Sequence, residues 1–159
     1  MMDLPTAIKW ALTCLLLLAA WSDARRFLIP NLYPALIMLI FPVALLTSFP
    51  FEAPLWSHMM HFAVALVAGM ALFRFGWFGG GDVKLYAAVT LWFGISSALF
   101  LFVVTTVSGG LVVLVRLAFY FLKLSVGSGG PKVRLLDRRI AYGIAIATGG
   151  IASIWTQYP

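Results

Sequence analysis

The sequence predicts an all-α polytopic membrane protein, a bundle of six transmembrane helices with both termini outside the cytoplasm. Hydrophobic residues make up 63% of the 159 residues and charged residues 10%, whereas soluble domains carry about 25% charged residues. The apolar residues fall into long runs, and no polar stretch is long enough to build a separate soluble domain. We therefore expect residues 1–159 to form a single membrane-embedded domain.

Six apolar runs follow one another along the chain. The predicted helices cover about residues 4–21, 32–48, 58–75, 83–93, 97–122 and 140–155. Pro5 and Pro34 suit first helical turns, and Pro42 predicts a kink of the kind that membrane helices tolerate. Residues 1–21 look superficially like a signal peptide. However, Asp3 and the basic pair after the apolar stretch favour a retained helix.

The longest apolar stretch, residues 83–122, must fold back once. It spans 40 residues and would be about 60 Å long as one helix, twice the hydrocarbon core of about 30 Å. Gly94-Ile95-Ser96-Ser97 is the best turn signal, which leaves a short fourth helix. Such a helix, about 17 Å long, does not cross the core alone. Either the preceding loop is drawn into the membrane or the turn lies later.

Basic residues gather in the first, third and fifth connections between the predicted helices, and the second and fourth connections carry none. The positive-inside rule therefore places the three basic connections in the cytoplasm. Nine of the eleven basic residues lie in these connections or their flanks: Arg25, Arg26, Arg74, Lys84, Lys123, Lys132, Arg134, Arg138 and Arg139. We interpret the net charge of +6 as topology and contact with anionic lipid, and expect no nucleic-acid partner.

Two of the five acidic residues fall at helix ends on the predicted cytoplasmic side. Asp23 follows the first apolar run, in a polar connection over residues 22–31. Asp82 precedes the fourth run and follows three consecutive glycines. A bundle can bring the two together without moving either charge across the bilayer, and an ionisable residue at a membrane boundary indicates a functional site. The glycines are expected to keep the wall beside Asp82 open to an extended substrate.

Two carboxyl groups a few ångströms apart cannot both ionise easily, so the pair can share a proton. The charged carboxyl can accept a proton from water while the protonated one donates to a peptide carbonyl, which hydrolyses an amide without a metal. The same pair also fits a small transporter or proton channel that uses the acids as a relay. A third interpretation is a silent scaffold in which Asp82 pairs with Lys84 or Arg74.

The other polar candidates are interpreted as structural. His58 and His61 lie about one helical turn apart on the outer side, and we expect interfacial polar residues because a metal site needs further ligands. Cys14 is the only cysteine and is interpreted as a packing residue. The pairs Gly143–Ala147 and Ala145–Gly149 predict close helix packing, with a groove for a substrate helix as the alternative. No metal and no other cofactor is expected.

Three segments resemble the motifs of type IV prepilin peptidases, which are membrane aspartic peptidases with a Gly-x-Gly-Asp motif. Asp23 followed by Ile29-Pro30-Asn31 resembles the first aspartate motif, and Gly79-Gly80-Gly81-Asp82-Val83-Lys84-Leu85 resembles the second. Tyr142-Gly143 resembles the Pro-Tyr-Gly segment of the last helix, with Ala141 in place of the proline. The resemblance extends in order over nearly the whole chain.

The resemblance implies an aspartic endopeptidase of the bacterial inner membrane, with Asp23 and Asp82 as catalytic residues at the cytoplasmic face. Its substrates would be prepilins or pseudopilins, which carry a basic leader before a hydrophobic helix. Pro30, Asn31, Lys84 and the three glycines are expected to form the active-site loop or the substrate approach.

The predicted first helix leads directly to the first aspartate, and no CxxC pair is present. The chain therefore resembles the short TadV/CpaA-like branch of Tad/Flp pilus systems, which implies a peptidase without methyltransferase activity. Archaeal preflagellin peptidases share the same aspartate arrangement and are a further possibility.

Overall fold

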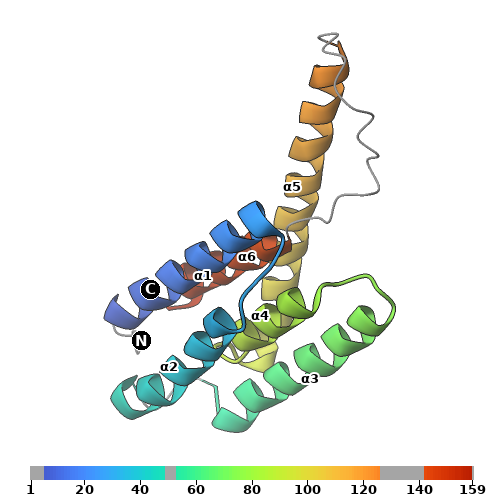
Figure 1. Ribbon diagram of the computed structural model, residues 1–159. Helices are drawn as coiled ribbons and strands as arrows, with labels where there is room; N and C mark the ends of the chain where they lie inside the picture. Colours follow the sequence, from blue (N-terminus) through green and yellow to red (C-terminus); the bar gives the residue numbers. More distant parts are fainter. Residues whose placement is uncertain (1–5, 49–52, 126–141, 159) are drawn as a thin grey trace.

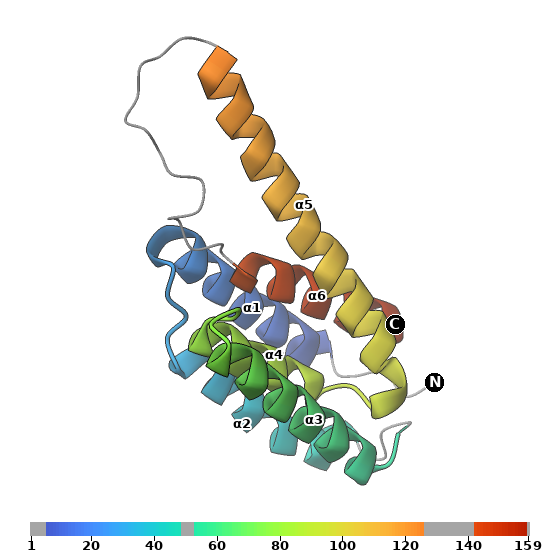
Figure 2. The same ribbon diagram turned by 90° about the vertical axis from the view of Figure 1, so that its right-hand side faces the viewer.

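The computed structural model describes residues 6–48, 53–125 and 142–158, and every regular element in these ranges is a helix (Figures 1 and 2). The elements are α1 (Thr6–Arg26), α2 (Leu32–Ser48), α3 (Leu55–Arg74), α4 (Gly80–Thr90), the 3₁₀ helix η1 (Ile95–Ser97), α5 (Ala98–Ser125) and α6 (Tyr142–Gln157). The predicted all-α fold is confirmed for the described residues.

The predicted fold-back near Gly94 is confirmed. α4 ends at Thr90 and η1 begins at Ile95, so the long apolar stretch forms two helices. Ser57, at the start of α3, accepts a hydrogen bond of 2.9 Å from the Ile95 N–H. A Cβ at Gly94 would lie 2.7 Å from the Ala53 Cβ, so the close approach of this turn to α3 requires glycine.

The first half of the polar connection predicted over residues 22–31 is wrong, because α1 continues to Arg26 and carries Asp23 in its last turn. Arg25 and Arg26 suit the carboxyl end of a helix, where the helix dipole is negative. Phe27 then ends the helix with a φ of 51°, a left-handed conformation that is common just after helices.

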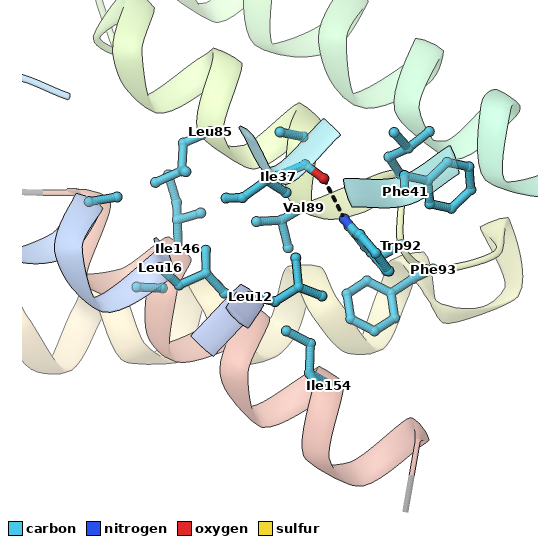
Figure 3. Close-up of a cluster of buried hydrophobic side chains, with 14 of the residues drawn as sticks. Leu12, Leu16, Ile37, Phe41, Leu85, Val89, Trp92, Phe93, Ile146 and Ile154 are labelled. Carbon is cyan, nitrogen blue, oxygen red and sulfur yellow. Dashed lines mark hydrogen bonds between the residues drawn. The ribbon is translucent and has the colours of Figure 1, made fainter. Parts of the chain in front are cut away.

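α4 is the central helix of the bundle. It packs against α2, α3 and α6 (Figure 2), and seven of its eleven residues are buried. Because lipid is as apolar as these side chains, close packing rather than exclusion of water holds such helices together. The α4 side chains Leu85 and Val89 belong to a buried apolar cluster that also includes Leu12, Leu16, Ile37, Phe41, Trp92, Phe93, Ile146 and Ile154 (Figure 3).

The carbonyl groups that follow α4, at residues 91–93, receive donors from other parts of the chain. His58 Nδ1 lies 3.0 Å from the first carbonyl oxygen and His61 Nδ1 2.9 Å from the third. The Tyr158 hydroxyl donates to the second. A carbonyl only accepts hydrogen bonds, so both histidines donate from Nδ1.

His58 and His61 are 1% and 3% exposed, so both are buried inside the bundle, and their expected place at the membrane interface stays a prediction. The last carbonyls of a helix lack partners within it, and α4 is too short to carry them out of the bundle.

The turn between α4 and α5 lies at Gly94, where it was predicted, and not later in the chain.

The outward faces of the helices are apolar. By length and composition, α1, α3 and residues Ile95–Phe119 can each span a membrane, and α2 is a shorter apolar helix. Only 6% of the apolar window in Ile95–Phe119 is buried, and the second half of α5 extends past the other helices (Figures 1 and 2). Soluble monomers rarely expose apolar surface on this scale. The protein is a multi-pass membrane protein.

Small residues bring α5 and α6 into close contact. A Cβ at Gly109 would lie 3.4 Å from the Ala145 Cβ, and a Cβ at Gly149 would lie 3.0 Å from the Thr105 Cα. The helix-packing interpretation of Ala145 and Gly149 is thereby confirmed.

We expect His61→Leu to lower the stability of the fold, because it leaves the Phe93 carbonyl buried without its donor. An unsatisfied buried group costs about 1–3 kcal/mol, which a thermal unfolding measurement in detergent detects. Met60→Leu is the matched control, since Met60 is 49% exposed on the same helix. Equal unfolding temperatures for the two variants would contradict the assigned role.

Candidate active site

The carboxylate of Asp23 is 5% exposed at the end of α1. Its Oδ2 accepts a hydrogen bond of 2.7 Å from the backbone N–H of Gly143, in the first turn of α6 and 120 positions away in the chain. Hydrogen bonds to an ionised carboxylate are short and roughly twice as strong as neutral ones. A Cβ at Gly143 would lie 2.8 Å from the same oxygen, so this contact requires glycine.

The carboxylate of Asp82 is 9% exposed in the first turn of α4. Its Oδ2 accepts a hydrogen bond of 3.2 Å from the backbone N–H of Gly79. A carboxylate in the first turn of a helix is also stabilised by the helix dipole. A Cβ at Gly79 would lie 2.6 Å from that oxygen, so this contact also requires glycine.

Ile29 lies between the start of α4 and the first turn of α6 and is 7% exposed. A Cβ at Gly81 would lie 3.1 Å from the Ile29 Cβ, and a Cβ at Gly143 would lie 3.0 Å from the Ile29 Cδ1. Gly81 immediately precedes Asp82, and Gly143 holds Asp23. The structure thus brings the two predicted aspartates together at one end of the bundle.

Burial raises the pKa of Asp82 from its ordinary 3.8 to about 6. The negative charge of Asp23 adds to the rise, and the hydrogen bond from Gly79 opposes it. Asp82 lies outside α1, α3 and Ile95–Phe119, the three helical segments that are long and apolar enough to span a membrane. Interacting carboxyls titrate as a unit, so near neutral pH the pair can hold one proton. One carboxyl can then donate a proton while the other accepts one.

Lys84 and Asn31 link the two aspartate segments on the exposed side of the site. Lys84 Nζ donates a hydrogen bond of 3.0 Å to Asn31 Oδ1. The carbonyl groups of Pro30 and Asn31 accept N–H groups of the first turn of α2, which fixes that loop. The hydrogen bond of Lys84 goes to Asn31 and not to Asp82, which does not favour the scaffold interpretation.

Two of the three glycines before Asp82 pack closely against other segments. Gly80 faces the Phe73 ring, whose Cε2 would lie 3.4 Å from an added Cβ, and Gly81 faces the Ile29 backbone oxygen at 3.3 Å. Together with the hydrogen bond from Gly79, these contacts give the glycines a role within the fold. Their expected role in substrate approach stays a prediction.

Tyr142, the first residue of α6, stacks on Phe78 with ring centroids 5.0 Å apart and an interplanar angle of 19°. Sequence reasoning assigned Tyr142 and Gly143 to the resembling segment and to packing, and missed these contacts with the aspartate segments. His58 and His61 lie at the other end of α4, about 17 Å from its start, and are not brought into this site.

The fold and the site together define a membrane protein whose paired buried carboxyls suit acid–base chemistry. Comparison with known protein families matches residues 10–114, which include both aspartates, to the type IV leader peptidase family. The match covers more than half of the chain, and the chain belongs to this family. It is therefore a peptidase, and the predicted resemblance is confirmed at the level of the family. No curated protein and no solved structure matches the chain.

The raised pKa of Asp82 makes stability depend on pH. The folded state binds the Asp82 proton more tightly than the unfolded chain does. Protonation of Asp82 therefore stabilises the fold in acid, and this stabilisation is lost as pH rises from about 4 to about 6. The Asn side chain of Asp82→Asn does not ionise, so the variant avoids this loss of stability, and its amide oxygen can still accept the Gly79 N–H. We expect the unfolding temperature of the variant, relative to wild type, to rise across this window and to level off above about pH 7. A flat or falling difference would contradict the assigned pKa.

Proposed function

We propose that this protein is an aspartic endopeptidase that removes the leader peptide from type IV prepilins and pseudopilins of the Flp/Tad type, at the cytoplasmic face of the bacterial inner membrane. The observation that carries the proposal is the pair Asp23 and Asp82, two buried carboxyls that interact at one end of the bundle. Family membership supports a leader peptidase. The Flp/Tad assignment rests on the resemblance to the short TadV/CpaA-like branch.

In the proposed mechanism the pair holds one proton in the resting enzyme, and we assign it to Asp82, whose pKa is raised by burial and by the charge of Asp23. Asp23 is the charged partner, and the N–H of Gly143 stabilises that charge. Asp23 accepts a proton from water as the water oxygen attacks the peptide carbonyl carbon. Asp82 donates its proton to the carbonyl oxygen. The proton on Asp23 then passes to the amide nitrogen as the C–N bond breaks, and the hydroxyl formed on the carbonyl oxygen returns its proton to Asp82.

The proposed topology has six membrane crossings, with both termini outside and the aspartates at the cytoplasmic boundary. Near Asp23, the Arg25 guanidinium lies 4.1 Å from the centre of the Trp21 ring, and Trp21 is 58% exposed. A basic residue stacked on an exposed tryptophan is typical of the headgroup region. In this orientation a substrate helix lies in the membrane beside the bundle, and its leader reaches the aspartates from the cytoplasm.

Asp23→Asn and Asp82→Asn should each abolish cleavage of a co-expressed prepilin, because each removes one of the two proton-transfer groups while barely changing side-chain size. The assay follows the shorter mature pilin on a gel, and thermal unfolding confirms that each variant folds. Asp137→Asn is the matched control and should cleave normally, since it neutralises an acid that belongs to neither aspartate motif of the sequence. Cleavage that survives either active-site change would refute the assignment.

The two carboxyls supply both proton transfers, so EDTA should leave cleavage by the purified protein intact. Strong inhibition by EDTA would indicate a metal-dependent reaction instead.

Reconstitution in liposomes tests the rival relay function on the same preparation. Proton or solute flux that depends on both aspartates, without a cleaved product, would favour a transporter or channel.

The topology is tested by cysteine labelling in a Cys14→Ala background. A membrane-impermeant maleimide applied to intact bacterial spheroplasts should label Trp56→Cys, near the α2–α3 connection. It should label Trp77→Cys, in the α3–α4 connection, only after lysis. Both tryptophans are more than half exposed, so the reverse pattern would invert the proposed orientation.

A further inference from the structure

The first turn of α6 touches both aspartate-bearing segments although it lies outside the family-matched residues 10–114. We infer that Gly143 and Tyr142 are positioning residues of the active site, with Gly143 holding Asp23 and Tyr142 holding the loop before Asp82. This inference rests on the proposed peptidase function.

Gly143 acts on Asp23 directly. Its N–H lies in the first turn of α6, where backbone N–H groups have no partner within the helix, and it donates to Asp23 Oδ2 at 2.7 Å. A Cβ at this position would meet Asp23 Oδ2 at 2.8 Å and Asp23 Cβ at 2.9 Å. Any side chain at Gly143 therefore displaces the carboxylate and not only a neighbouring packing residue.

Tyr142 acts on Asp82 through the loop that precedes α4. Its ring stacks on Phe78, and the next residue, Gly79, donates its N–H to Asp82 Oδ2. The stacked rings thus hold the donor of the Asp82 carboxylate against the same turn that supplies the donor of Asp23. One turn of one helix sets the position of both carboxylates relative to each other.

The experiment measures kcat and KM for cleavage of a synthetic prepilin by the purified full chain in detergent. We expect Gly143→Ala to lower kcat by about 100-fold, the effect of misplacing a catalytic group by about an ångström, with KM unchanged. Tyr142→Ala should lower kcat in the same way, and Tyr142→Phe should restore it because the stacking ring is kept. Gly110→Ala in α5 is the matched control, since nothing lies within 4 Å of a Cβ there.

A wild-type kcat for Gly143→Ala, or loss of cleavage in Gly110→Ala equal to that in Gly143→Ala, would overturn the inference while the proposed function stands. Failure of the wild-type protein to cleave any prepilin would instead overturn the proposed function.

A second measurement does not depend on activity or on the folding of Gly143→Ala. In ¹⁵N-glycine-labelled wild-type protein, the Gly143 amide proton should shift with pH as the carboxylate that it contacts ionises. The shift should vanish in Asp23→Asn. A Gly143 amide proton that is insensitive to this change would also overturn the inference.

Discussion

A helix buried on nearly all sides must find partners for the backbone groups at both of its ends, and α4 is such a helix. In an apolar interior each unsatisfied group is expensive. At its start, Asp82 accepts the N–H of Gly79. After its end, His58, Tyr158 and His61 donate to three consecutive carbonyl groups. The rest of the bundle is arranged so that α3 and the C-terminal residues can deliver these donors.

The same requirement explains why an acid can be buried at the start of α4. A carboxylate there satisfies a backbone donor and lies at the positive end of the helix dipole, so the fold tolerates it. A second carboxylate nearby makes full ionisation of the pair unfavourable. The acid–base capacity of the site thus follows from placing Asp23 next to a carboxyl that the fold already needs. Ile29 packs against Gly81, which precedes Asp82, and against Gly143, which donates a hydrogen bond to Asp23.

Much of this arrangement could be predicted from local patterns. Apolar runs, prolines and the Gly94 turn signal marked the helices, and the scarcity of acids marked Asp23 and Asp82. The end of α1 was misjudged because Asp23 and its arginines are polar yet remain helical. The hydrogen bonds of His58 and His61 were missed because nothing in their own segment shows that α4 ends beside them. The N–H of Gly143 carried no signal, since every residue except proline has such a donor and only the tertiary fold selects this one.

The contact between Gly143 and Asp23 also bears on the order in which the protein is made. The two residues are separated by 120 positions, so α1 enters the membrane long before its partner is synthesised. During translation the Asp23 carboxylate lacks the N–H that later holds it, and the long-range contact closes only when α6 packs beside α1 (Figure 1). Until its last described helix is in place, a nascent chain therefore lacks the hydrogen bond that holds the Asp23 carboxylate. Maturation of the site is thereby coupled to completion of the bundle.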